Sequence, residues 1–247
     1  MAKKRLTKQG KIIILALFAL LLFSFWFTTS GPRAYKINMP KGYKVHGIDV
    51  SRYQGKINWK ELENMSDGRD NVKISFAYLK ATEGRSIQDP LFKANWDNIA
   101  KSNILRGAYH FFIATRSPQE QAQNFIKHVQ LKKGDLPPVL DIEHIGNQSA
   151  AKLKENVKIW LTLIENHYGM KPIIYTNIDF YENYLNDKEI RKYPLWIAHY
   201  YKKKPKMGEP WIMWQHSDQG EISGIKEKID FNVFNGSLRD LQSLCKK

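Results

Sequence analysis

Two acidic residues stand two positions apart in a short apolar run, residues 136–144 (LPPVLDIEH). Side chains alternate along a strand with a period of two, so Asp141 and Glu143 project from one face while Leu140 and Ile142 project from the other. Carboxyl groups held this close do not ionise independently, and the better-buried one keeps its proton near neutral pH. A proton donor beside an anion suits glycoside cleavage. A bare Asp-x-Glu also occurs at strand ends that only cap helices, so the surrounding pattern must decide.

Apolar strand-like runs alternate with amphipathic patterns along the body of the chain. We expect about eight strands, at residues 47–50, 72–80, 106–112, 138–142, 172–176, 194–199, 211–215 and 229–231. Helices are expected at residues 58–64, 90–102, 117–130 and 149–168, and they become scarce after residue 195. This alternation predicts an α/β fold with a parallel barrel, and the helix-poor last third predicts an irregular closure by short strands.

Chemically useful side chains stand at the expected carboxyl ends of nearly all these strands. They are Asp49, Lys80 with Glu83, Tyr109, Asp141 with Glu143, Tyr175, Trp196 with His199, Gln215 and Asp230. Active sites of α/β barrels lie at that end, so we expect these residues to converge on one face. Aromatic faces pack against sugar rings, and carboxylates and amides bind hydroxyl groups. The set predicts a sugar-binding cleft, with no metal and no cofactor, whereas His110 and His128 are expected to be structural.

Residues 1–30 differ in kind from the rest of the chain. Five basic residues among the first 11 precede an apolar stretch, residues 12–27, that only Ser24 interrupts. This is the pattern of an export signal. The stretch is intermediate in length between a signal-peptide core and a membrane span, and no A-x-A cleavage site follows it. We therefore expect the catalytic part outside the cytoplasm, membrane-anchored and facing outward if the segment stays, and periplasmic or extracellular if it is cleaved.

The body of the chain is basic. Without the five basic residues of the first 11, it has 34 basic and 24 acidic residues, a net charge of +10. This surplus suits a polyanion such as nucleic acid, an anionic membrane face or a bacterial wall. The export signal, the lack of a reader motif and the spread of the basic residues argue against nucleic acid. We expect a linker at residues 31–45 and one catalytic domain at residues 46–247, monomeric and without an intrachain disulfide, because Cys245 is the sole cysteine.

Several sequence blocks match one enzyme family in order. They are residues 47–51 (GIDVS), 54–55 (QG), 57–59 (INW), 80–84 (KATEG), 89–90 (DP), 106–111 (RGAYHF), 140–143 (LDIE), 174–177 (IYTN), 195–200 (LWIAHY), 214–215 (WQ) and 229–232 (IDFN). With them the chain closely resembles the glycoside hydrolase family 25 lysozymes over about residues 46–235. The resemblance implies an N-acetylmuramidase that acts on peptidoglycan. It also implies a flattened TIM-like barrel of five β/α units closed by short β-strands.

The same resemblance implies roles for the acids. Glu143 corresponds to the general acid that protonates the glycosidic oxygen of the β-1,4 bond between N-acetylmuramic acid and N-acetylglucosamine. Asp141 is its partner, and Asp49 and Asp230 complete an acidic ring. Two alternatives for the second half of the mechanism stay open. Either a carboxylate attacks the anomeric carbon, or the acetamido group of the muramyl ring attacks it, supported by Asp141 and Tyr175. The other strand-end residues are expected to bind substrate: Lys80, Glu83, Tyr109, Tyr175, Trp196, His199 and Gln215.

Three other interpretations make different predictions. A wall-binding module that has lost turnover would lack acids at the strand ends, whereas all four are present. A chitinase-like barrel with a similar Asp-x-Glu carries further aspartates ahead of the pair, and residues 136–140 contain none. A nucleic-acid-binding protein would present a basic, aromatic stripe instead of an acidic cleft. The sequence leaves open whether the enzyme remodels the cell's own wall or attacks another cell.

Overall fold

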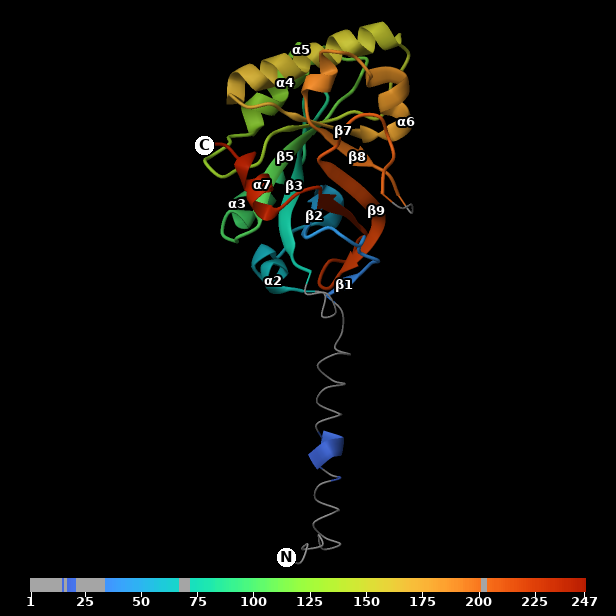
Figure 1. Cartoon of the computed structure of the whole chain (residues 1–247). Helices are drawn as coiled ribbons and strands as arrows, with labels where there is room; N and C mark the ends of the chain where they lie inside the picture. Colours follow the sequence, from blue (N-terminus) through green and yellow to red (C-terminus); the bar gives the residue numbers. More distant parts are fainter. Residues whose placement is uncertain (1–14, 16, 21–33, 67–71, 201–203) are drawn as a thin grey trace, which may run out of the picture.

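Eight strands close into a barrel in the computed structural model, which describes residues 15, 17–20, 34–66, 72–200 and 204–247 (Figure 1). Neighbouring barrel strands run parallel from the first to the seventh, and the eighth lies antiparallel between the seventh and the first. In chain order they are β2 (Val45–Val50), β3 (Ile74–Glu83), β5 (Leu105–Phe111), β6 (Val139–Asp141), β7 (Ile173–Asn177), β8 (Leu195–Ala198), β9 (Met213–Ile222) and β10 (Ile229–Phe234). The predicted α/β barrel is confirmed.

Each of the first five barrel strands is followed by a helix. These helices are α2 (Trp59–Asn64), α3 (Phe92–Ile99), α4 (Pro118–His128), α5 (Ala150–Tyr168) and the short α6 (Ile178–Phe180). In Figure 1, α4 and α5 lie side by side across the end of the molecule farthest from β1. The last three barrel strands are helix-poor, and α7 (Leu238–Ser243) follows only after β10. The five β/α units and the irregular closure agree with the sequence prediction.

The boundaries of the two long helices follow from local chemistry. The Ser117 side chain accepts a hydrogen bond from the Glu120 amide at the start of α4, and Pro118 occupies the first turn, where no amide donor is required. Ser149 caps α5 in the same way. Gly169 ends α5 in the left-handed conformation with φ of 68°, which a residue without Cβ adopts without strain. Side-chain caps and one glycine therefore set three of these four helix ends.

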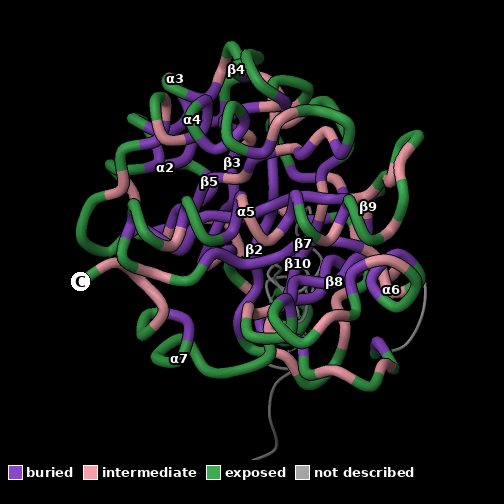
Figure 2. The backbone as a smooth tube through the Cα atoms, turned by 90° about the horizontal axis from the view of Figure 1, so that it is seen from above, coloured by how far each residue is buried: buried purple, intermediate pink, exposed green. Residues whose placement is uncertain are grey.

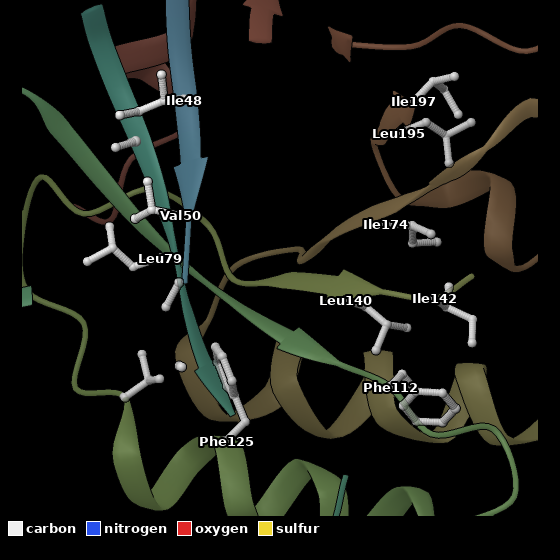
Figure 3. Packing of buried hydrophobic residues seen from close by; sticks show 14 of the residues in the cluster. Ile48, Val50, Leu79, Phe112, Phe125, Leu140, Ile142, Ile174, Leu195 and Ile197 are labelled. Atoms are coloured by element: carbon white, nitrogen blue, oxygen red, sulfur yellow. The ribbon is translucent and has the colours of Figure 1, made fainter. Parts of the chain in front are cut away.

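Side chains of the barrel strands alternate between two apolar layers. On β6, Val139 belongs to the cluster inside the barrel, and Leu140 to the larger cluster between the strands and the helices. Figure 3 shows part of the outer layer, in which Leu140, Ile174 and Leu195 are cross-strand neighbours. Figure 2 shows the buried strands surrounded by more exposed helices. Because Asp141 lies two positions after Val139, it shares the inward face.

The segment expected as a linker contributes to the barrel wall. Residues 35–36 form strand β1 (Tyr35–Lys36), which pairs antiparallel with the far end of β9, and Tyr35 is buried. We call residues 35–44 the strap, because this segment packs along β9. Among the described residues, no helix between β8 and β9 covers β9, and the apolar side chains of the strap shield β9 instead. β9 is also longer than predicted and continues to Ile222.

The predicted signal or anchor, residues 1–30, lies outside the described residues except for residues 15 and 17–20, which are helical. Within the described residues, no helix has both the length and the apolar character needed to cross a membrane.

Candidate active site

A cavity of about 180 Å³ opens at the carboxyl end of the parallel strands. Seven of the eight barrel strands, or the residues directly after them, supply its walls. Eight of the predicted site residues line it: Asp49, Tyr109, Asp141, Glu143, Tyr175, Trp196, Gln215 and Asp230. Val139 and Tyr200 complete the lining. The strand-end pattern therefore identified most of this wall.

The strand register explains why residues far apart in sequence meet here. Asp49 on β2 and Asp230 on β10 are direct cross-strand partners. On the other side of the barrel, Asp141, Tyr175 and Trp196 are successive partners on β6, β7 and β8. Cross-strand partners point to the same face of a sheet, and in this barrel that face is the interior. The topology thus produces two carboxyl pairs around one cavity.

The first pair is Asp141 with Glu143. Asp141 is only 7% exposed, whereas Glu143 is partly open to solvent. Burial raises the pKa of Asp141 well above its usual range, and the charge of Glu143 and a hydrogen bond between the two side chains raise it further. Asp141 Oδ1 has no hydrogen-bond partner among the described residues. Burial therefore favours the protonated form of Asp141, and the hydrogen bond between the two side chains lets the pair share that proton.

The second pair is Asp49 with Asp230, and two amides hold Asp49. Asn232 Nδ2 donates to Asp49 Oδ2 at 2.7 Å, and Gln215 Nε2 donates to the same oxygen at 2.8 Å. Burial raises the pKa of Asp49 to about 6, although these two hydrogen bonds and one with Asp230 lower it. Asp49 is therefore an anion at pH 7 in spite of its burial.

The orientation of both amides is fixed by their other partners. Gln215 Oε1 accepts hydrogen bonds from the Tyr175 hydroxyl at 2.6 Å and the Tyr200 hydroxyl at 2.5 Å, so the NH₂ group must face Asp49. Asn232 Oδ1 accepts a hydrogen bond from the Trp196 indole at 2.9 Å, so the NH₂ group of Asn232 must also face Asp49. We call Gln215 and Asn232 the amide clamp. The amide of Gln215, expected to bind substrate, is instead bonded to protein groups on both sides.

Asp230 is the protonated member of the second pair. Burial raises its pKa to about 9, followed by the negative charge of Asp49 and a hydrogen bond with it. Two carboxylates directly opposite one another cannot both ionise, and the clamp stabilises the charge on Asp49. The raised pKa values of Asp141 and Asp230 therefore favour a proton in each pair, which reduces the negative charge of the cavity.

Three predicted residues lie outside the cavity wall. Lys80 and Glu83 form an ion pair at 2.7 Å, and the Lys80 ammonium lies 4.7 Å from the centre of the Phe111 ring. The positive charge of Lys80 nevertheless acts on the site, because it opposes the rise in the pKa of Asp141. The backbone of His199 pairs with β9, since its amide donates to the Gln215 carbonyl. These residues surround the cavity without forming its surface.

Sequence reasoning missed two polar residues of the site, Tyr200 and Asn232. Asn232 lies two positions after Asp230 on β10, so strand alternation places both on one face and could have identified it. Tyr200 lies beyond the end of β8, where that period no longer applies.

The remaining predictions concern histidines and metals. His110 is structural as expected: it is completely buried, and its Nδ1 lies 2.7 Å from Thr82 Oγ1. Burial lowers the pKa of His110 to about 3, so the ring is neutral. Within the described residues, no three His, Cys, Asp or Glu side chains are arranged to hold a metal ion.

Comparisons with known proteins agree with this geometry. The chain is 38% identical to YegX of Escherichia coli (strain K12), over 98% of this chain and 94% of that protein. It is 34% identical to Lysozyme M1 of Streptomyces globisporus, over 87% of this chain and 76% of that protein. The structure of a family 25 glycosyl hydrolase from Bacillus anthracis matches with a TM-score of 0.74 at 32% identity, covering 84% of this chain and 96% of that chain.

A bacterial lysozyme from Streptomyces coelicolor matches with a TM-score of 0.73, also at 32% identity, covering 83% of this chain and 99% of that chain. The family model described as glycosyl hydrolases family 25 matches residues 48–225, which include three of the four cavity carboxylates. The fourth, Asp230, follows five residues later and faces Asp49 across the sheet. The chain therefore belongs to glycosyl hydrolase family 25.

Proposed function

We propose that this protein is an N-acetylmuramidase that hydrolyses the β-1,4 bond between N-acetylmuramic acid and N-acetylglucosamine in peptidoglycan. The observation that carries the proposal is the cavity at the carboxyl end of a family 25 barrel, lined by two carboxyl pairs in each of which one member has a raised pKa. Relatives include Lysozyme M1 and an N,O-diacetylmuramidase of Chalaropsis sp. Peptidoglycan glycan strands are the partner that this activity requires.

Glu143 is the general acid in this proposal. Both acids line the cavity, and Glu143 is the more exposed of the two, so we assign it as the group that reaches a bound glycosidic oxygen. The shared proton passes to the glycosidic oxygen as the bond from that oxygen to the anomeric carbon breaks. Asp49 supplies a fixed negative charge toward the positive charge that develops on the sugar ring. Glu143 is then an anion, ready to accept a proton from the attacking water.

The second step is better supported as attack by the acetamido group of the muramyl ring than as attack by a carboxylate. Asp141 is buried, and the amide clamp occupies one oxygen of Asp49 twice, so neither is a free nucleophile. Once the shared proton has passed to the glycosidic oxygen, Asp141 is an anion that can accept a hydrogen bond from the acetamido N–H and so orient that group. A substrate with a trifluoroacetamido group should react much more slowly, because that carbonyl oxygen is a poorer nucleophile. An unchanged rate would support direct attack.

We assign the surrounding residues by their position. Tyr109, Tyr175 and Trp196 line the cavity and would bind the sugar ring. Gln215 acts through Asp49. The Lys80–Glu83 pair and His199 lie behind the wall, where they support its charge and its shape. The cavity is complete within one chain, so the proposal requires only a monomer.

Product analysis tests the proposed bond. Purified peptidoglycan is digested with residues 31–247, and the new reducing ends are reduced with borohydride and identified by mass spectrometry. We expect muramitol ends, and their absence when wild type is replaced by Glu143→Gln. Glucosaminitol ends, or no digestion by wild type, would reject the proposal.

We propose further that residues 1–30 direct export and that residues 12–27 remain as a membrane anchor. The support is the nearly continuous apolar stretch and the lack of a cleavage site after it. Sequencing the amino terminus of the mature protein tests this. An intact terminus in the membrane fraction is expected, and a mature chain that starts near residue 31 would exclude the anchor.

A further inference from the structure

A short turn at the cavity rim is held rigidly although it projects into solvent. It is the 3-10 turn Arg52–Gln54, which directly follows β2. The Ser51 amide donates to Gln54 Oε1 at 2.9 Å, and the Arg52 amide donates to Asp89 Oδ2 at 2.8 Å. Gln54 Nε2 donates to the Lys228 carbonyl at 2.8 Å. The turn is therefore tied on one side to the loop after β3 and on the other to the segment before β10.

These ties place the turn beside the acidic pair. Asp49 belongs to β2 and lies three residues before Arg52. Asp230 belongs to β10 and lies two residues after Lys228. Both carboxyl groups line the cavity. A glycan strand that crosses the cavity on this side must therefore pass the turn Arg52–Gln54.

The turn displays an aromatic ring and a cation. Tyr53 is 66% exposed, an unusual position for an aromatic side chain on a fixed backbone. The Arg52 guanidinium lies 5.1 Å from the centre of the Tyr53 ring and donates to its hydroxyl at 3.2 Å. Among the described residues, no carboxylate lies within ion-pair distance of Arg52. The nearest acids are engaged elsewhere, because Glu83 pairs with Lys80, and Asp89 accepts backbone amides.

We propose that Arg52 and Tyr53 form a subsite that binds an anionic muropeptide unit of the substrate. The Tyr53 ring packs against a sugar, and the Arg52 guanidinium binds a carboxylate of the peptide attached to that sugar. A guanidinium presents a planar fork of donors that matches a carboxylate, and aromatic faces suit the apolar face of a sugar ring. The subsite rests on the proposed muramidase function, and it would make the KM of that activity depend on the peptide attached to the sugar.

The test compares two substrates. Glycan strands with their stem peptides, and the same strands after carbodiimide coupling to methylamine has converted the peptide carboxylates to neutral amides, are digested by wild type and by Arg52→Gln. We expect the KM of Arg52→Gln to rise by about 10-fold on the unmodified strands, because a charge-assisted contact is lost, with kcat unchanged. The amidated strands should show little change. Arg239→Gln, which removes an exposed arginine on α7, is the charge-matched control and should leave both KM values unchanged.

The second part of the test substitutes Tyr53. Tyr53→Ala should raise KM on both substrates, and Tyr53→Trp should preserve it, because the ring contact does not depend on the peptide. Equal KM changes for Arg52→Gln on both substrates, or an unchanged KM for Tyr53→Ala, would overturn the subsite. A wild type inactive on both substrates would instead reject the muramidase function. Thermal unfolding of each variant shows whether the fold is intact.

Discussion

At the scale of single residues, the amide clamp distinguishes four carboxyl groups that look alike in sequence. Gln215 and Asn232 both donate to Asp49, and no comparable clamp holds Asp230 within the described residues. The fixed amide dipoles stabilise one anion and leave the proton on its neighbour. The clamp therefore assigns different roles to two aspartates that face each other.

Isosteric substitutions test this assignment. Asp49→Asn removes a clamped anion and should reduce kcat by at least about 100-fold. Asp230→Asn replaces a carboxyl group that already carries a proton at pH 7, so activity should stay within about 10-fold of wild type. Equal losses in the two variants would contradict the assignment.

The pH profile provides an independent check. Wild-type activity should fall below about pH 6, where Asp49 gains a proton, and above about pH 9, where Asp230 loses one. Asp230→Asn should lack the fall near pH 9 that Asp230 produces, because an amide does not ionise, and should keep the fall that follows loss of the proton shared by Asp141 and Glu143. An alkaline limb that is unchanged in this variant would show that another group produces it.

Much of the site could be predicted because strand alternation and barrel topology are readable in sequence. Asp49, Asp141 and Asp230 all follow from that rule. Lys80 obeys it too, but strict alternation would place Glu83, three positions later, on the opposite face. The register between β3 and β5 shifts after Lys80, and the two side chains pair with each other. Charge pairing across a local irregularity is not visible in the sequence. The set of hydrogen bonds that orients Gln215 is not visible in the sequence either, because its partners are side chains from three other strands or loops.

At the scale of elements, the eight barrel strands and the helices α2 to α5 were predictable from hydrophobic periodicity. The strap was not, because β1 has only two residues and its partner on β9 lies nearly 190 positions further along the chain. Such a pairing depends on the closed barrel and not on local sequence. The strap replaces the missing helix over β9.

Two neutral histidines beneath the strap make its packing sensitive to pH. His46 Nε2 lies 3.1 Å from the Tyr43 carbonyl, and His46 Nδ1 and His216 Nε2 have no partner among the described residues. Burial lowers the pKa of His216 to about 3, and the charge of His46 lowers it further. The cavities lined by these rings also contain Lys41 and Lys204, which cannot stabilise an added positive charge.

His216→Phe should remove the part of this pH sensitivity that His216 contributes. An unfolded histidine binds a proton below about pH 6.5 and the buried one does not, so the stability of wild type is lost as pH falls through that value. From pH 7 to pH 5, the free energy of unfolding of wild type should fall by about 2 kcal/mol relative to the variant. Urea unfolding at both pH values measures this, with the exposed His167→Gln as control. The buried carboxyl groups are common to both proteins, so their contributions to the pH dependence cancel when the two free energies of unfolding are subtracted. If the free energies of unfolding of wild type and His216→Phe differed by the same amount at pH 7 and pH 5, the role assigned to His216 would be refuted.

At the scale of the whole molecule, the basic body and the acidic cavity act over different ranges. The net charge of +10 is spread over the surface, whereas the cavity is lined by four carboxyl groups. Surface charges attract a polyanionic wall over about a Debye length, and salt screens them, while contacts inside the cavity are protected.

Binding to purified sacculi should therefore weaken with salt. Sedimentation of Glu143→Gln with sacculi is expected to fall between low salt and about 0.15 M, where the Debye length is about 8 Å. The KM for short soluble fragments, which contact mainly the cavity, should change less. Binding to sacculi that does not depend on salt would exclude a diffuse electrostatic contribution.

The most direct test of the central claim asks whether Glu143 supplies the proton to the leaving group. Rates of wild type and Glu143→Gln are compared on peptidoglycan and on an aryl muramyl glycoside whose nitrophenol leaves without protonation. We predict a loss of at least about 100-fold on peptidoglycan and a much smaller loss on the aryl glycoside, because only the sugar leaving group needs the acid. Equal losses on both substrates, or full activity of Glu143→Gln on peptidoglycan, would contradict the account.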